Sequence, residues 1–457
     1  MKESLKVGVS GVRGIVGQSL TPPIACAFAE AFGTYVGRGL VVVGRDTRPS
    51  GRMIEHAVVA GLLATGCRPL LAGVAPTPTI LFLTRQLGAR GGICITASHN
   101  SAPWNALKFA GPAGVFLDAQ QADELVDLYH QRDFRRVEEQ ALRPVARLPD
   151  PVAGHFQKVA GYVDTALIRS RRFRVAVDGC NGVGAAHSMA FLRDVLGCEV
   201  VMVFGDPHGR FEREPEPRPE NLGALCAAVT ANDCVVGFAQ DPDGDRLALV
   251  DETGKPIGED LTLAFAIDQV LEFHGRGPVV VNLSSSRRVL HAARRHGAEP
   301  SLTRIGEINV VSEMLARGAV VGGEPNGGVI LPAVHPCRDS YSAMALVLER
   351  LARTGSSISA LARDYPTTAV VKRKMRIRGD EAPLLLRALR RRHERETLNL
   401  LDGVHITFAD AVAHVRPSNT EPVLRLETEA PGPERANSLA DDIEAFLRDT
   451  QTSGHGG

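Results

Sequence analysis

The sequence has little that would point to a membrane, to nucleic acid or to zinc. No apolar run approaches the roughly 20 residues that a helix needs to span a bilayer, and no apolar signal segment follows the first residues. The formal net charge is zero, so no overall field attracts a polyanion. The eight cysteines stand singly, without the Cys-x-x-Cys spacing of zinc sites. We therefore expect a cytoplasmic protein with reduced cysteines and with no membrane or nucleic-acid partner.

The length and the hydrophobic patterning predict several α/β domains. At 457 residues the chain is too long for one hydrophobic core. Apolar runs that predict strands alternate with helical periodicity, which is typical of parallel or mixed sheets: strands at 40–43, 69–73 and 91–95, and helices at 22–38 and 52–65. The alternating segment that begins at residue 5 predicts one more strand, which closes on a glycine turn at Ser10–Gly14. Residues 451–457 are expected to be disordered.

Shifts in composition divide the chain into expected domains. An Arg-rich and Pro-rich stretch at 131–150 separates the first unit from a new strand at 173–177. A further α/β unit begins near residue 258, and a basic strand at 369–377 opens the last segment. The expected domains are 1–150, 151–254, 255–365 and 366–457.

A serine loop, Thr96–Asn100, follows the apolar run 91–95. Ser98 therefore stands at a strand end, where chemistry is often found, with His99 beside it and Lys108 ten residues on. Serine is a weak nucleophile, so a base, a metal or a cation must activate it. The alternative is a polar loop that caps a following helix.

An acidic loop follows the apolar run 235–240. Asp241, Asp243 and Asp245 alternate in a tight loop and can direct three hard oxygen ligands to one point, which suits Mg²⁺. A calcium EF-hand is disfavoured because Arg246 stands where its sixth residue must be glycine. A solvated acidic turn remains the alternative. Arg246 itself could hold a phosphate beside the metal.

Two loops near the C-terminal half offer ligands for a sugar and a phosphate. Gly322–Gly328 brings Glu324 and Asn326, which are good partners for vicinal hydroxyls. Arg416–Pro422, with Arg425 in the next strand, offers guanidinium, hydroxyl and backbone N–H donors for phosphate. Simple turns are the alternative for both loops.

One glycine-rich segment resembles a dinucleotide-binding turn without matching it. Asp178–Gly184 follows the strand at 173–177, but its spacing is GxxGxG rather than GxGxxG. No acidic residue closes a second strand at the expected distance. A nucleotide cofactor is therefore disfavoured.

The four loops together resemble the hallmark loops of the α-D-phosphohexomutase family. They match the patterns T-A-S-H-N, D-x-D-G-D-R, G-E-x-[SN]-G and R-x-S-N-T-E-P, in the family's order, and Ser10–Gly14 and Gly44–Arg48 match as well. The resemblance covers nearly the whole chain. It implies a heart-shaped protein in which each of four domains contributes one loop to a central cleft. The first three would be related α/β domains with mixed sheets, and the smaller fourth would be α+β.

The resemblance implies an isomerase-class mutase that interconverts hexose or hexosamine 1-phosphate and 6-phosphate. The implied route runs through phospho-Ser98 and a glucose- or hexosamine-1,6-bisphosphate, which is both intermediate and activator. Glucosamine phosphate is the first choice of substrate, and glucose and mannose phosphates are the alternatives. The residues implied are, for catalysis, Ser98, His99, Lys108, Arg13 and Arg246; for one Mg²⁺, Ser98, Asp241, Asp243 and Asp245; for the sugar, Glu324 and Asn326; and for the phosphate, Arg416, Ser418, Asn419, Thr420 and Arg425.

The sequence departs from the family pattern at a few positions. Gly328 stands where many members have a histidine, so His335 or Lys108 is expected to compensate as acid or base. The Pro-Asn-Gly-Gly loop with Arg338-Asp339 downstream is more similar to archaeal-type members. A metal-dependent sugar phosphatase and a non-catalytic phosphosugar-binding relative remain alternatives. The partner is a small phosphosugar, and the protein is expected to be a monomer or a homodimer.

Overall fold

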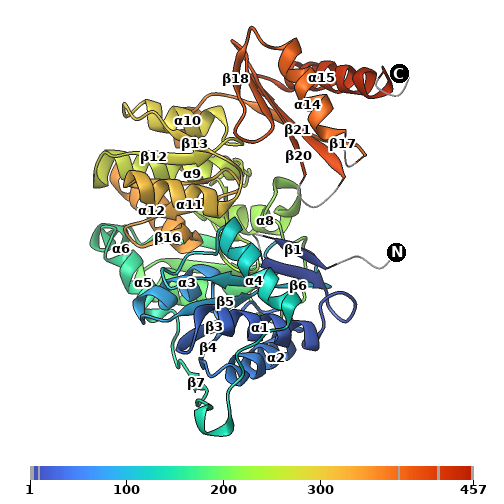
Figure 1. The fold of residues 1–457 in the computed structure, drawn as a ribbon. Coiled ribbons are helices and arrows are strands. Elements are labelled where there is room, and N and C mark those ends of the chain that lie inside the picture. Colours follow the sequence, from blue (N-terminus) through green and yellow to red (C-terminus); the bar gives the residue numbers. More distant parts are fainter. Residues whose placement is uncertain (1–4, 9–10, 379–380, 419–421, 454–457) are drawn as a thin grey trace.

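A computed structural model of the chain describes residues 5–8, 11–378, 381–418 and 422–453. Figure 1 shows the N-terminal unit at the bottom and the C-terminal unit at the top, with the other units between them. Three sheets are mixed and the fourth is antiparallel. The predicted class, α/β units with mixed sheets followed by a smaller α+β unit, is therefore confirmed.

The first unit is built on a sheet of order β1-β2-β6-β5-β3-β4-β7. The strands β5, β3, β4 and β7 are parallel, and β6, β2 and β1 continue the sheet in antiparallel pairs. The elements are β1 (Lys6–Gly8), β2 (Gly11–Ile15), α1 (Pro22–Val36), β3 (Leu40–Arg45), α2 (Gly51–Ala64), β4 (Arg68–Val74), α3 (Thr77–Gln86), β5 (Gly91–Ile95), β6 (Trp104–Ala110), α4 (Ala119–Gln131) and β7 (Ala146–Arg147).

The expected first strand is present as β1, but the expectation of a glycine turn was wrong for residues 11–14, because they belong to a second strand, β2, that pairs antiparallel with β1. Gly11 has φ 91°, and a Cβ there would lie 2.1 Å from the Leu107 carbonyl oxygen of β6. Only glycine fits that combination of positive φ and close approach. The hairpin places Arg13 beside β6.

The second unit has the sheet order β11-β10-β8-β9 and the third has β13-β12-β14-β15-β16. The second comprises α5 (Ala153–Ala160), α6 (Thr165–Arg171), β8 (Arg174–Asp178), α7 (Val183–Met189), β9 (Glu199–Val203), α8 (Gly223–Ala231), β10 (Val236–Gln240) and β11 (Leu247–Val250). The third comprises α9 (Glu259–Gln269), β12 (Val279–Asn282), α10 (Arg287–Arg294), β13 (Ser301–Thr303), α11 (Glu307–Arg317), β14 (Val321–Glu324), β15 (Gly328–Leu331), β16 (His335–Arg338), α12 (Ser340–Thr354) and α13 (Ile358–Arg363).

The last unit packs two helices on the antiparallel sheet β17-β21-β20-β19-β18. Its elements are β17 (Ala369–Arg376), α14 (Ala382–Arg392), β18 (Thr397–Asn399), β19 (Val404–Thr407), β20 (Val412–Pro417), β21 (Val423–Ala430) and α15 (Pro433–Ser453). Because α15 continues to Ser453, the expectation of disorder from residue 451 was wrong for the first residues of that tail.

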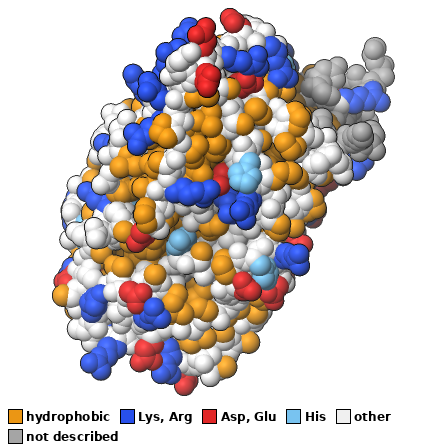
Figure 2. Space-filling view, turned by 90° about the horizontal axis from the view of Figure 1, so that it is seen from below, with side chains coloured by type: hydrophobic (Ala, Val, Ile, Leu, Met, Phe, Trp, Pro, Cys, Tyr) orange, Lys and Arg blue, Asp and Glu red, His pale blue; other side chains and the backbone are white. Residues whose placement is uncertain are grey.

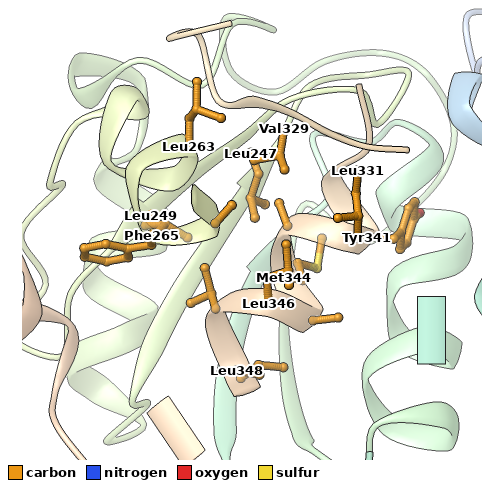
Figure 3. Close-up of a cluster of buried hydrophobic side chains, with 14 of the residues drawn as sticks. Leu247, Leu249, Leu263, Phe265, Val329, Leu331, Tyr341, Met344, Leu346 and Leu348 are labelled. Atoms are coloured by element: carbon orange, nitrogen blue, oxygen red, sulfur yellow. The ribbon is translucent and has the colours of Figure 1, made fainter. Parts of the chain in front are cut away.

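The second and third units share one hydrophobic core. Figure 3 shows Leu247 and Leu249 of β11 among side chains of α9, β15 and α12, such as Phe265, Val329 and Met344. The core cluster of the last unit, in contrast, contains only residues of that unit. Burial of apolar surface therefore joins the two middle units into one body.

A buried polar chain joins the first three units. Thr79 of α3 lies 2.9 Å from Nδ1 of His155 on α5, and Nε2 of His155 lies 3.0 Å from Asp339, which caps α12. All three side chains are buried. Because buried polar groups are costly unless they are hydrogen-bonded, this chain favours one relative placement of the three units.

The surface is mixed in character. On the face in Figure 2, basic and acidic side chains lie interspersed among hydrophobic ones. None of the helices in the described part of the chain combines the length and apolar character that a membrane crossing requires. All eight cysteines are free.

Candidate active site

The serine loop holds Ser98 in a strained, buried position. Ser98 follows β5 with φ 47°, a region that non-glycine residues rarely adopt. Its N–H donates to Thr96 Oγ1 at 2.9 Å, and its Oγ donates to Asp241 Oδ2 at 2.8 Å. His99 Nδ1 lies 3.4 Å from the same Oγ. The predicted nucleophile, its histidine neighbour and the acidic loop therefore meet at one point.

Arg48, for which the sequence indicated no role, stabilises the serine loop through hydrogen bonds to its backbone. It is 1% exposed and pairs with Asp46, which also accepts a hydrogen bond from Thr96. Its guanidinium donates to the backbone carbonyls of Ser98, Asn100, Ser101 and Trp104. The Gly44–Arg48 motif marked the segment in the sequence. Nothing in the sequence could show that one guanidinium would satisfy so many carbonyls of a distant loop.

The three aspartates of the acidic loop form a group that fits a divalent cation. One carboxylate oxygen of each of Asp241, Asp243 and Asp245 lies within 4.8 Å of the others, and all three side chains are buried. Oδ1 of Asp243 and Oδ1 of Asp245 are buried without a hydrogen-bond partner among the described residues. Burial and the two neighbouring carboxylates raise the pKa of Asp241 well above its usual value. A hard cation such as Mg²⁺ would relieve this repulsion and bind the free oxygens.

Lys108 and Thr77 fix the other oxygen of Asp243. Lys108 Nζ lies 2.9 Å and Thr77 Oγ1 lies 3.0 Å from Asp243 Oδ2. Burial alone would lower the pKa of Lys108, but Asp243 and Asp245 outweigh it and hold that pKa above its usual value. Lys108 is therefore a charged ammonium group here, and Thr77 is a contact that the sequence did not indicate.

Two arginines bring positive charge to the serine loop. Arg13 of β2 donates to Asn100 Oδ1 at 2.5 Å, and Arg246 donates to Glu216 at 3.1 Å. Arg246 most strongly, then burial and Arg13, lower the pKa of His99 to about 2. His99 is therefore neutral, beside a positive field that suits a phosphate group.

The glycine-rich loop Gly322–Gly328, called the sugar loop here, includes the end of β14 and the start of β15. It carries Glu324 and Asn326, the predicted sugar ligands. Glu324 Oε1 accepts from Asn282 Nδ2 at 2.9 Å and from the Gly306 N–H at 3.1 Å. Asn326 Oδ1 has no hydrogen-bond partner in the described ranges of the chain. The Gly327 carbonyl accepts from the Leu247 N–H at 3.1 Å, so this loop is attached to the strand that follows the acidic loop.

Arg416 and Arg425 lie opposite each other on the adjacent strands β20 and β21. Burial lowers the pKa of Arg416, and Glu324 of the sugar loop is among the charges that act on it. The charges of Glu324 in the sugar loop and of Arg416 in the predicted phosphate loop therefore interact. Ser418 N–H donates to the Val423 carbonyl at 2.9 Å. Asn419 and Thr420, also predicted to bind phosphate, lie outside the described residues.

His335 is buried in a contact with the first unit. It is 3% exposed, and its Nε2 lies 2.7 Å from the Gly114 carbonyl oxygen, to which it donates. Of the two candidates to compensate for the histidine missing at position 328, His335 is engaged with Gly114, whereas Lys108 contacts the acidic loop. The ring instead joins β16 to a loop of the first unit.

The glycine-rich segment Asp178–Gly184 supports the acidic loop. A Cβ at Gly182 would lie 2.6 Å from Pro242 Cα, and the Val183 N–H donates to the Pro242 carbonyl at 3.0 Å. The glycines permit this close backbone contact. They explain the motif without a nucleotide.

Comparison with known proteins finds matches along most of the chain. Four models of the phosphoglucomutase/phosphomannomutase family match: α/β/α domain I over residues 4–136, domain II over 153–254, domain III over 258–368 and the C-terminal domain over 371–446. A phosphoglucomutase/phosphomannomutase of Thermococcus kodakarensis is 36% identical, and 94% of this chain and 95% of that protein are covered. A probable phosphoglucosamine mutase of Methanopyrus kandleri is 35% identical, with 96% and 97% covered.

The fold agrees with these matches. A crystal structure of a phosphoglucomutase/phosphomannomutase family protein from Burkholderia thailandensis superposes with a TM-score of 0.86 and 27% identity, and covers 97% of each chain. The family models match most of the sequence, and the candidate site is assembled from all four matched regions. The chain therefore belongs to the phosphoglucomutase/phosphomannomutase family, the α-D-phosphohexomutases, whose members are mutases of the isomerase class.

Proposed function

We propose that the protein interconverts glucosamine 1-phosphate and glucosamine 6-phosphate through phospho-Ser98 and an enzyme-bound 1,6-bisphosphate. The observation that carries the proposal is the hydrogen bond from Ser98 Oγ to Asp241 Oδ2, 2.8 Å long, at the edge of the three aspartates. The choice of an amino sugar rests on the relative of M. kandleri, which is named a phosphoglucosamine mutase. Glucose and mannose phosphates are the competing substrates, because the relative of T. kodakarensis is named for them.

The acidic loop and Ser98 would together hold one Mg²⁺. Asp243 Oδ1 and Asp245 Oδ1 accept no hydrogen bond from the described residues, although Arg246 Nε lies 3.7 Å from Asp245 Oδ1, and Asp241 already contacts the serine that would carry the phosphoryl group. Bound Mg²⁺ would neutralise charge on the transferring phosphoryl group, which is the main chemical requirement of this reaction type.

Arg13 and Arg246 would bind the phosphoryl oxygens and so prepare His99 as a proton acceptor. In phosphoryl transfer the bond from phosphorus to Ser98 Oγ breaks, a bond to the free sugar hydroxyl forms, and the hydroxyl loses its proton. The two arginines now lower the pKa of His99. A phosphate dianion on Ser98 would offset their charge, and the pKa of His99 would rise toward a useful value. Lys108, already paired with Asp243, would serve as a fixed cation or as the acid.

The other loops would hold the part of the substrate that does not react. Glu324 and Asn326 would accept and donate hydrogen bonds to the sugar hydroxyls, and Arg416, Ser418, Asn419, Thr420 and Arg425 would bind the second phosphate. Because a mutase must retain its bisphosphate while the sugar turns over, a second phosphate site is needed that a phosphatase does not require. The facing pair Arg416 and Arg425 supports the mutase in this respect.

A coupled assay tests the proposal. Purified protein with Mg²⁺ and a trace of sugar 1,6-bisphosphate would be given the 1-phosphates of glucosamine, glucose and mannose, and formation of each 6-phosphate would be followed. We expect glucosamine phosphate to have the highest kcat/KM. Ser98→Ala should lower kcat by at least about 10³-fold, because the covalent route is lost. Removal of Mg²⁺ with EDTA should stop turnover reversibly.

The matched control is Ser170→Ala, which removes the hydroxyl of an exposed serine on α6 and should leave activity unchanged. Mass spectrometry should find phosphate on Ser98 of the wild type after incubation with bisphosphate. Release of inorganic phosphate without isomerisation would contradict the mutase and favour a phosphatase. Turnover that survives in Ser98→Ala would contradict the phosphoserine route.

A further inference from the structure

Arg338, at the end of β16, lies between the acidic loop and the sugar loop. It is 7% exposed. Its NH2 donates to Asp245 Oδ2 at 2.5 Å, its NH1 donates to Glu324 Oε2 at 2.9 Å, and its Nε donates to Glu307 Oε2 at 3.2 Å. Glu307 also accepts a hydrogen bond from the Arg338 backbone N–H at 3.0 Å, which fixes the backbone from which the side chain extends. One guanidinium therefore contacts carboxylates from the acidic loop, from the end of β14 and from the first turn of α11.

The contact with Asp245 decides which oxygen of that carboxylate is available. Arg338 donates to Oδ2, whereas Oδ1 is buried and accepts no hydrogen bond in the described part of the chain, with Arg246 Nε as a longer ion-pair contact at 3.7 Å. Lys108 does the same for Asp243, whose Oδ2 is occupied and whose Oδ1 is free. Partners that hold one atom of a ligand fix the direction of the other, and their loss weakens metal binding.

The contact with Glu324 acts on the sugar loop in the same way. Arg338 holds Oε2, while Asn282 and Gly306 hold Oε1, so the carboxylate has a single orientation. The stem of Arg338 also fills the space beside position 328, because a Cβ at Gly328 would lie 2.3 Å from Arg338 Cδ. A side chain at 328 and this arrangement of Arg338 exclude each other.

We propose that Arg338 is a positioning residue that ties the orientation of the metal ligand Asp245 to that of the sugar ligand Glu324. The inference rests on the metal and sugar sites of the proposed function. Arginine suits the task because its planar fork presents donors in fixed directions to several carboxylates at once, whereas lysine is a single point of charge. The described hydrogen bonds of the Arg338 guanidinium go to Asp245, Glu324 and Glu307, so its effect would pass through Asp245 and Glu324.

The test compares Mg²⁺ binding and sugar kinetics in the full-length protein. Wild type, Arg338→Met and Arg338→Lys would be stripped with EDTA and titrated with MgCl₂ by calorimetry, and kcat and KM for glucosamine phosphate would be measured separately. Arg350→Met is the matched control, since Arg350 is a buried arginine that pairs with Asp268 and Glu272 away from the cleft. Thermal unfolding would monitor the fold of each variant.

We expect Arg338→Met to weaken Mg²⁺ binding by about tenfold or more and also to raise KM, while Arg350→Met changes neither. Arg338→Lys should restore at most one of the two quantities, and it carries the test alone if Arg338→Met does not fold. Unchanged Mg²⁺ affinity in Arg338→Met, or a lysine variant with both quantities at wild-type values, would overturn the inference. Absence of Mg²⁺ binding to the wild type would overturn the proposed metal site itself and, with it, the role of Arg338.

Discussion

At the scale of single residues, buried charges hold the reactive groups in place. Arg48 is the clearest case, because its guanidinium satisfies Asp46 and several carbonyls of the serine loop. Arg48→Met should therefore lower the free energy of unfolding by about 3–5 kcal/mol, since Asp46 would remain as a buried, unpaired charge. It should also lower kcat, because the positive φ of Ser98 would lose its support.

Denaturant unfolding followed by circular dichroism, together with the coupled assay, checks this prediction. The control is Arg174→Met, which removes one member of an exposed ion pair with Glu199. Exposed pairs contribute little, so its unfolding should match the wild type. A small stability loss in Arg48→Met, equal to that of the control, would mean that the serine loop keeps its shape without the guanidinium.

The residues of the site were predictable to different degrees. Ser98, the aspartates and Glu324 lie in short motifs whose chemistry is local, so the sequence alone indicated them. Arg48, Thr77 and Arg338 act on loops that are far away in the sequence, and their partners depend on how the sheets bring those loops together. No spacing rule could have found these contacts.

At the scale of elements, β16 joins the third unit to the first through a histidine that resists protonation. Burial, the largest cause, lowers the pKa of His335 to about 4, from an ordinary value near 6.5. Between pH 6.5 and 4 the unfolded chain therefore binds one more proton at this position than the folded chain. Stability falls as the pH drops through that window, and above pH 6.5 the position contributes no pH dependence.

Substitution of His335 should remove this part of the acid sensitivity. We expect His335→Gln to lose less stability than the wild type between pH 7.5 and pH 5.0, with a difference on the order of 2 kcal/mol at pH 5.0. Thermal unfolding at the two pH values measures it. His130→Gln, at an exposed histidine on α4, should retain the wild-type pH dependence. Equal acid sensitivity in His335→Gln and the wild type would show that the buried ring is protonated without cost.

The sequence predicted most of the helices and strands but missed the β1–β2 hairpin and the end of the last helix. The alternation of strands and helices was visible in the hydrophobic pattern, and the mixed sheets agree with it. The hairpin at β1–β2 was missed because its alternating residues continue on both sides of the turn. Disorder was expected from residue 451, although α15 reaches Ser453, because the last turn of this helix is polar and a polar face carries no signal of where a surface helix stops.

At the scale of the whole molecule, the units are joined by different forces. The two middle units share a hydrophobic core, and the polar chain through His155 joins them to the first. The described contacts between the last unit and the third include a set of polar ones: Arg287 with Glu429 and with the Asp410 carbonyl, Arg304 with the Leu401 carbonyl, and Ile305 with Asp402. A few hydrogen bonds are weaker than a shared core, so these contacts govern how firmly the last unit docks.

Glu429 is the residue through which this docking can be tested. Both of its carboxylate oxygens accept the Arg287 N–H at 3.0 Å, at the first turn of α10, where a negative charge is favourable. Hydrogen bonds to charged groups contribute about 1.5–3 kcal/mol, so Glu429→Ala should loosen the last unit and raise KM for the phosphosugar on the order of tenfold. The effect on kcat should be smaller, because Ser98 and the aspartates lie in the other units.

Small-angle scattering of Glu429→Ala should report a larger radius of gyration than that of the wild type. The control Glu434→Ala, at an exposed position of α15, should leave both KM and the radius of gyration unchanged. A fall in kcat at constant KM would instead place Glu429 in the chemistry rather than in the docking of the last unit.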